Sequence, residues 1–154
     1  MKKLIMLCVI LISVAGLVKA APSYLITFDE FPLNTLIDDE YAAMGVQFYP
    51  GDITGRLPQI DNNGAMPTMP VLRATGEPDF NIYQGDFWIR FTTTAAEVTF
   101  DSGYWDAIGA GVINVYDPYM VPLASLTNTT TGVNVTNITG RIGHIHFNSI
   151  ADGA

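Results

Sequence analysis

The 154-residue chain contains a single cysteine, Cys8, and all three of its lysines lie within the first 20 residues. Beyond residue 20 of this sequence no disulfide can form and no thiol can act as a nucleophile. That stretch keeps four arginines against 15 acidic residues, a net charge of −11. Such an acidic surface repels phosphate backbones and anionic lipids, so nucleic acid is a poor partner.

Long apolar runs are also scarce, apart from one near the N-terminus. Residues 4–18 are almost wholly apolar, Lys2 and Lys3 precede them, and Val18-Lys19-Ala20 supplies small residues for cleavage. This is the three-part pattern of a secretory signal, and the run is shorter than the roughly 20 residues of a spanning helix. We predict a signal peptide over residues 1–20, cleaved after Ala20; an uncleaved membrane anchor is the alternative. Residues 21–154 are then one exported domain, without membrane insertion, located outside the cell, on its surface or in a periplasm.

Recognisable catalytic motifs are missing. The sequence has no G-x-S-x-G elbow, no H-E-x-x-H helix and no phosphate-binding loop. Acidic pairs are present, but a glycosidase needs two carboxylates at a defined separation in a cleft, which a sequence does not show. We therefore predict no catalytic residues and no enzymatic activity, and keep a polysaccharide hydrolase as the remaining catalytic alternative.

What the sequence does contain is a series of short β-prone segments separated by turns. The first, Tyr24 to Phe28, leads into a predicted short helix over residues 35–44, which Gly45 ends, and a strand over 45–49 follows. Segments with alternating or β-branched patterns then occur at 71–74, 87–91, 96–101, 111–117, 122–126 and 141–147. The Thr-rich stretch 127–139 is predicted to form a loop and one outer strand. This pattern predicts an all-β protein, an antiparallel sandwich or barrel.

The order of the motifs carries a resemblance. Ile-Thr-Phe-Asp-Glu at 26–30 is followed by Gly-Val-Gln-Phe at 45–48, Val-Thr-Phe-Asp at 98–101 and Arg-Ile-Gly-His-Ile-His-Phe at 141–147. This series resembles exported bacterial jelly-roll β-sandwich proteins of the PEP-CTERM-associated, galactose-binding-like type, which are similar to carbohydrate-binding modules. The resemblance covers nearly all of residues 21–154 and implies an antiparallel jelly-roll sandwich with one short helix. Its motifs specify the fold far better than the ligand.

The resemblance also bears on a missing element and on a metal. In that family a closing strand follows the equivalent of residues 141–147, and none is found before Ala154, so we expect a domain without its closing C-terminal strand. The family often has a calcium site after the first strand, which makes Asp29 and Glu30 the best candidates for a structural calcium site. The alternative is that both carboxylates cap a turn, because calcium needs several converging oxygen ligands.

Aromatic side chains are the residues most relevant to binding. Tyr104 and Trp105 lie in a predicted loop, and Trp88 lies on the outward side of its strand beside Arg90. Flat sugar faces stack on such rings, and polar groups such as Arg90 and Asp106 can hold sugar hydroxyls. We predict a ligand-binding set of Trp105, Tyr104, Trp88, Arg90 and Asp106. The alternative is that both tryptophans pack under loops and only stabilise the domain.

Two histidines complete the candidates. His144 and His146 share one face of a predicted strand and could reach one metal ion, but no third ligand is evident, so a solvated face is favoured. Together these features predict a non-catalytic module that binds a polysaccharide or cell-surface glycan. The alternative is a structural protein of an envelope or extracellular matrix without a small ligand.

Overall fold

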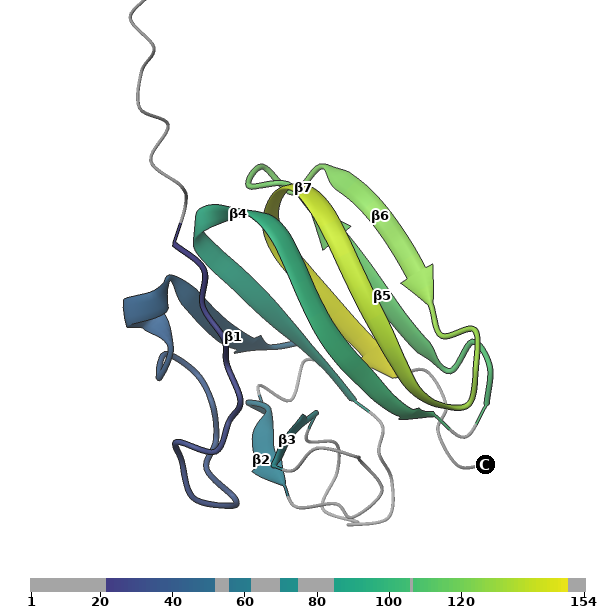
Figure 1. The fold of residues 1–154 in the computed structure, drawn as a ribbon, viewed down its shortest axis with the longest axis horizontal. Coiled ribbons are helices and arrows are strands. Elements are labelled where there is room, and N and C mark those ends of the chain that lie inside the picture. The colour runs from purple at the N-terminus through teal and green to yellow at the C-terminus, as the bar shows by residue number, and fades with distance from the viewer. Residues whose placement is uncertain (1–21, 52–55, 62–69, 75–84, 106, 150–154) are drawn as a thin grey trace, which may run out of the picture.

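The computed structural model describes residues 22–51, 56–61, 70–74, 85–105 and 107–149. The predicted signal peptide, residues 1–20, and the last residues, 150–154, lie outside these ranges, so neither the signal nor the missing closing strand is tested. The described part is all-β with antiparallel sheets, which confirms that part of the fold prediction (Figure 1). Within it, no helix is long and apolar enough to cross a membrane.

The main sheet has five antiparallel strands in the spatial order β1-β4-β7-β5-β6. Their bounds are β1 Val46–Pro50, β4 Gly85–Trp105, β5 Gly111–Tyr116, β6 Pro122–Thr127 and β7 Gly132–Ser149. A separate two-stranded sheet consists of β2, Gln59–Asp61, and β3, Val71–Arg73. The segments predicted as strands from residue 45 onward therefore all contribute to strands.

Strands β4 and β7 are long enough to run through two layers. Residues 85–90 of β4 pair with 144–149 of β7, while residues 97–105 pair with 132–139, and the register shifts between Arg90 and Ala95. On β7 the turn between the halves includes Gly140, whose φ of 145° favours glycine. Figure 1 shows both ribbons bending at the same end, so that their second pairing lies over the first. We call residues 97–105 and 132–139 the folded arm.

The folded arm covers one half of the inner face of the sheet and makes the protein sandwich-like. Val98, Phe100 and Ile138 from the arm pack against the cluster formed by β5 and β7. Ile142, at the bend, is completely buried. Burial of these side chains between the layers is the favourable term that holds the arm in place, at roughly 25 cal/mol per Å² of apolar surface.

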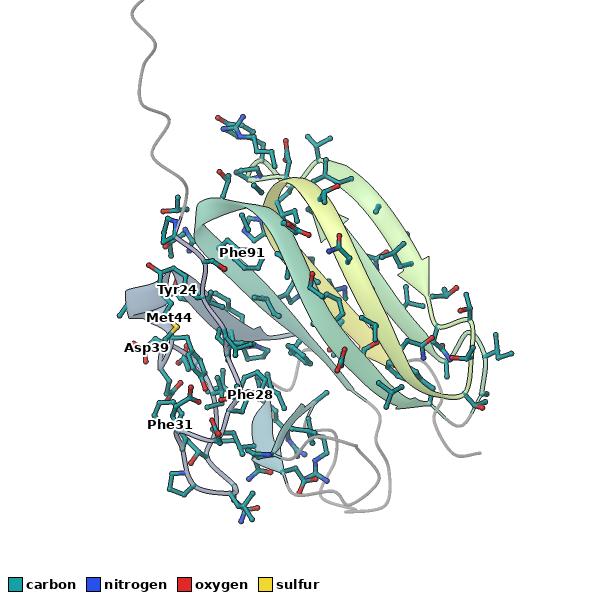
Figure 2. The ribbon with its side chains drawn as sticks, in the orientation of Figure 1. Tyr24, Phe28, Phe31, Asp39, Met44 and Phe91 are labelled. Carbon is teal, nitrogen blue, oxygen red and sulfur yellow. The ribbon has the colours of Figure 1, made fainter. Side chains whose placement is uncertain are left out.

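The N-terminal segment covers the other half of the same inner face. Phe28 and Phe31 pack against a cluster that includes Tyr41, Phe48 and Phe87. Figure 2 shows Tyr24, Phe28 and Phe31 along this segment, on the side of the molecule that holds β1. The prediction of a strand over residues 24–28 is wrong: this segment pairs with none of the strands in the described part of the chain, and Phe28 has a left-handed φ of 65°. It covers the sheet with side chains instead of extending the sheet through its backbone.

The helix predicted over residues 35–44 is reduced to one 3-10 turn, η1, Ala42–Met44. Gly45 ends it in the left-handed conformation, with φ 80°, as predicted. Leu36 and Ile37 are extended because the β2 segment offers them strand-like hydrogen bonds: Leu36 forms a bridge with Gln59, and the Ile37 N–H donates to Pro58 O at 2.8 Å. Residues 38–41 form a bend and a turn. Backbone pairing with a neighbouring strand has overridden the local helical preference.

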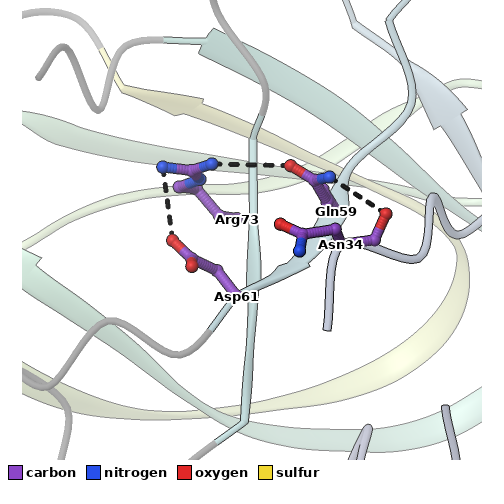
Figure 3. Close-up of polar contacts among 4 residues, drawn as sticks. All are labelled: Asn34, Gln59, Asp61 and Arg73. Carbon is purple, nitrogen blue, oxygen red and sulfur yellow. Dashed lines mark hydrogen bonds and ion pairs between the residues drawn. The ribbon is translucent and has the colours of Figure 1, made fainter. Parts of the chain in front are cut away.

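Polar contacts join the N-terminal segment to the β2–β3 hairpin (Figure 3). Gln59 Nε2 donates to Asn34 O at 3.0 Å, and Arg73 donates to Gln59 Oε1 at 3.5 Å and pairs with Asp61 at 3.2 Å. The Asn34 N–H also donates to Ile60 O at 2.8 Å. These bonds place the buried Ile60 under the N-terminal segment.

Replacing Phe48 by alanine tests this packing. Phe48 is only 2% exposed and contacts aromatic rings of both the segment and the sheet. We expect Phe48→Ala to lower the free energy of unfolding by about 3–5 kcal/mol in chemical denaturation. The control Val135→Ala changes a side chain that is 73% exposed and should stay within about 0.5 kcal/mol of the parent. Equal losses in the two variants would contradict the packing described here.

Candidate functional site

The outer face of the five-stranded sheet carries aromatic and polar side chains in rows. Successive strand residues point to opposite faces, so the residues between the buried ones share the face turned away from the core. Strand register aligns one row across all five strands: Tyr49, Trp88, His146, Asn114 and Ser125. A second row lies beside it: Gln47, Arg90, His144, Tyr116 and Pro122. We call these rows, with Asp86, the outer face; none of its residues belongs to either hydrophobic cluster of the described chain.

Two aromatic neighbours on the outer face contact the ring of Trp88. Its ring stacks on His146, with centroids 4.2 Å apart and planes 8° from parallel, and contacts Tyr116 at 5.5 Å. Trp88 is half-buried rather than fully exposed, as is Tyr49 beside it. Part of the Trp88 side chain is accessible, so a ligand can contact the ring there.

Hydrogen bonds fix the polar side chains around this ring. The Tyr49 hydroxyl donates to Gln47 Oε1 at 3.0 Å, and Ser125 Oγ donates to Asn114 Oδ1 at 2.7 Å. His144 Nδ1 lies 3.3 Å from Asp117 O in the β5–β6 turn. Side chains that are already ordered lose less entropy when a ligand binds, so the outer face is pre-organised for contact.

Asp86 and His146 form an ion-pair geometry at the edge of the outer face. Asp86 Oδ2 lies 2.9 Å from His146 Nε2, and both side chains are mostly buried. The other oxygen, Oδ1, is buried without a hydrogen bond to any residue that the structure describes. Asp86 therefore orients His146 against the ring of Trp88.

A pocket of about 240 Å³ lies elsewhere, between the folded arm and strands β5 and β6. Trp105 lines it, and its ring packs so closely on Gly111 that a Cβ there would lie 2.4 Å from the indole. Asn128 closes one end: its side chain accepts from the Gly111 N–H at 2.9 Å and donates to Ala107 O at 2.8 Å. Glycine at 111 is thus required by the position of Trp105.

The predicted ligand-binding residues fall in two places. Trp88 and Arg90 lie together on the outer face, whereas Trp105 lines the pocket. Asp106 and the side chain of Tyr104 lie outside the described residues. The sequence predicted the outward orientation of Trp88, but not its partners Tyr49 and His146. Alternation places each of these residues on a face, and only the strand register brings them side by side.

The predicted calcium ligands point to separate partners. The Thr27 hydroxyl donates to Asp29, and the Tyr41 hydroxyl donates to Glu30 Oε2 at 3.0 Å. In the part of the chain that the structure describes, no three His, Cys, Asp or Glu side chains gather at a common point. Calcium at Asp29 and Glu30 stays a prediction, and Glu30 has an additional role as the acceptor for Tyr41.

The Tyr41 hydroxyl is protected from ionisation. Burial raises the pKa of Tyr41 well above its usual value of 10, and the hydrogen bond to Glu30 adds to the rise. The folded protein therefore keeps this proton at a pH where the unfolded chain releases it. Stability from this group is complete below about pH 10 and is lost as the pH rises further.

Replacing Tyr41 by phenylalanine tests this linkage. We expect the free energy of unfolding of the parent to fall as the pH rises above about 10, and Tyr41→Phe to reduce that fall, because its ring has no proton to lose. The control Tyr119→Phe alters a residue that is 73% exposed and should keep the slope of the parent. Identical slopes in all three proteins would contradict the assigned environment of Tyr41.

Calcium is tested by thermal melting. If calcium binds at Asp29 and Glu30, millimolar calcium should raise the melting temperature and a chelator should reverse the rise, since an ion bound to the folded state stabilises it. Asp29→Asn should remove the response while leaving the Tyr41–Glu30 bond in place. A melting temperature that is the same with calcium and with chelator would refute the site.

Comparisons with protein-family models, with curated proteins and with solved structures gave no match for this chain. The fold is therefore described by its strand order and register alone. The outer face and the pocket are the two places in the described residues that can indicate a function.

Proposed function

We propose that this chain is an exported, non-catalytic recognition module whose outer face binds a polysaccharide or a cell-surface glycan. Membership of the jelly-roll sandwich proteins that its motifs resemble, and export by residues 1–20, are parts of the same proposal. The observation that supports it most is the position of Trp88, stacked on His146 and aligned with Tyr49 across neighbouring strands.

The chemistry of the outer face suits sugars. A sugar ring has an apolar face that stacks on an aromatic side chain and hydroxyls at its rim that need donors and acceptors. Trp88 supplies the ring, the amides of Gln47 and Asn114 supply both kinds of polar group, and the exposed Arg90 adds donors. The mixture favours a glycan over a purely apolar ligand.

The length of the rows favours a chain of sugars over a single one. Each row crosses five strands. Neighbouring strands are about 4.8 Å apart, so the four intervals span about 19 Å. An extended surface of this length has room for several linked units, which supports a polysaccharide as the ligand.

Replacing Trp88 by alanine tests the proposal. We expect the parent to be retained by at least one member of a panel of insoluble and immobilised polysaccharides, and Trp88→Ala to weaken retention about 10-fold or more, because stacking and burial are both lost. Trp105→Phe is the matched control, since it changes the other tryptophan and leaves the outer face intact. Circular dichroism melting curves should show that both variants are folded.

A second measurement needs no substitution in the protein that is tested. The chain has two tryptophans, so its ¹H–¹⁵N spectrum has two indole signals, which the two variants assign. A soluble oligosaccharide of a retained polysaccharide should shift the Trp88 signal. Retention of no polysaccharide, or undiminished retention of Trp88→Ala, would overturn the proposal and favour a structural envelope or matrix protein.

A further inference from the structure

The pocket beside Trp105 is separate from the outer face. It lies at the side of the sandwich where the folded arm faces strands β5 and β6, and its lining comes from both layers. The residues that line it are Ser102, Trp105, Gly111, Ile113, Leu126, Thr127, Asn128, Thr129, Asn134, Val135, Thr136 and Asn137. None of them belongs to the rows of the outer face.

None of the described residues that line this pocket carries a charge, although the chain as a whole is strongly acidic. Trp105, Ile113 and Leu126 provide apolar surface, and the remaining lining is mostly hydroxyl and amide groups. An ion would have no opposite charge to pair with here, and desolvating it would be costly. The lining therefore fits a neutral ligand with an apolar face and several hydroxyl groups.

Trp105 contributes its ring to the pocket, whereas its N–H lies out of reach of a ligand. The indole Nε1 has less than 1 Å² of accessible surface, so an oxygen in the pocket cannot approach it to hydrogen-bond distance. A ligand therefore meets the carbon atoms of the Trp105 ring, and the apolar face of a sugar can pack on them.

The end of the pocket near Trp105 is held in a fixed shape. Asn128 links Gly111, Ala107 and Thr130 through three side-chain hydrogen bonds. Asn134 donates to Thr130 O and Gly132 O and accepts from the Thr130 hydroxyl. The connection between β6 and β7 is thus ordered by hydrogen bonds from two side-chain amides. This side of the pocket therefore has its shape before a ligand binds.

The size of the pocket matches one small unit. A volume of about 240 Å³ equals that of roughly eight water molecules, at about 30 Å³ each in the liquid. It is below the roughly 300 Å³ at which pockets for drug-sized ligands begin. A single sugar ring or a similar polyol fits this range.

We propose that the pocket between the folded arm and β5–β6 is a second binding site, which takes one neutral sugar unit or polyol and packs it against the ring of Trp105. This site does not depend on the function proposed for the outer face. Thr136, on the arm, provides a hydroxyl on the side of the pocket opposite Ile113 and Leu126.

Titration with small sugars tests the second site. Glucose, galactose, mannose, N-acetylglucosamine and myo-inositol are added to the full-length ¹⁵N-labelled protein, and the two indole signals are followed. We expect at least one of these probes to shift the Trp105 signal in a saturable way and to leave the Trp88 signal in place. Glucuronate is the matched charged probe and should bind more weakly than glucose, because the described lining residues include no cation.

Variants then assign the contact. By calorimetry, Trp105→Phe should bind the active probe about 3- to 10-fold more weakly, because the smaller ring buries less apolar surface against the ligand. Thr136→Val keeps the shape of its side chain without the hydroxyl and should also weaken binding if Trp105→Phe proves unstable. The control Tyr119→Phe changes a residue that is 73% exposed and lies in neither site, and it should bind like the parent.

Three results would overturn the second site. They are no saturable shift with any neutral probe up to about 100 mM, unchanged affinity in both Trp105→Phe and Thr136→Val, and loss of binding in Trp88→Ala. The last result would assign the small sugar to the outer face and support the first proposal alone.

Discussion

A continuous series of aromatic contacts holds the three parts of this protein together. It starts in the N-terminal segment, where Phe31 contacts Tyr41 at 5.7 Å, and enters the sheet through the contact between Tyr41 and Phe48 at 6.2 Å. It then crosses the sheet from Phe48 to Phe87 and Phe147, and reaches the folded arm through Phe147 and Phe100 at 5.0 Å. Without cysteine in residues 21–154, this apolar packing is what joins the segment, the sheet and the arm.

The two candidate sites follow from how the core is distributed. The inner face of the sheet is covered by two different elements, the N-terminal segment and the folded arm, so the outer face is left for polar and aromatic side chains. The pocket arises where the arm stops short of closing against β5 and β6. Strand β4 contributes one tryptophan to each candidate site. Trp88 lies before the bend of the strand, and Trp105 is the last residue of the strand.

Local sequence patterns predicted the strands and their faces well. The alternation from Phe87 to Phe91 placed Trp88 and Arg90 outward, and the glycine at 45 marked the end of the short helical turn. Local patterns failed where a distant partner decided the conformation. Leu36 and Ile37 became extended because β2 lies beside them.

The candidate sites were less predictable than the strands, for the same physical reason. Trp88 meets His146 through a pairing between residues 58 positions apart, a register that no local window contains. Trp105 was expected in an open loop, yet its ring lies on Gly111, because β5 returns beside the end of β4. In both cases the residue type indicated a binding role, whereas contacts between distant parts of the sequence determine which side chains surround the tryptophan.

The bend that creates the arm also couples the two layers mechanically. In most sandwiches each layer is built from its own strands, so one sheet can loosen while the other persists. Here β4 and β7 pass through both layers, and the hydrogen-bonded ladder between them continues across the turn at Gly140. Separating the layers would strain the strands that form the centre of the main sheet, so the arm and the sheet should melt as one cooperative unit.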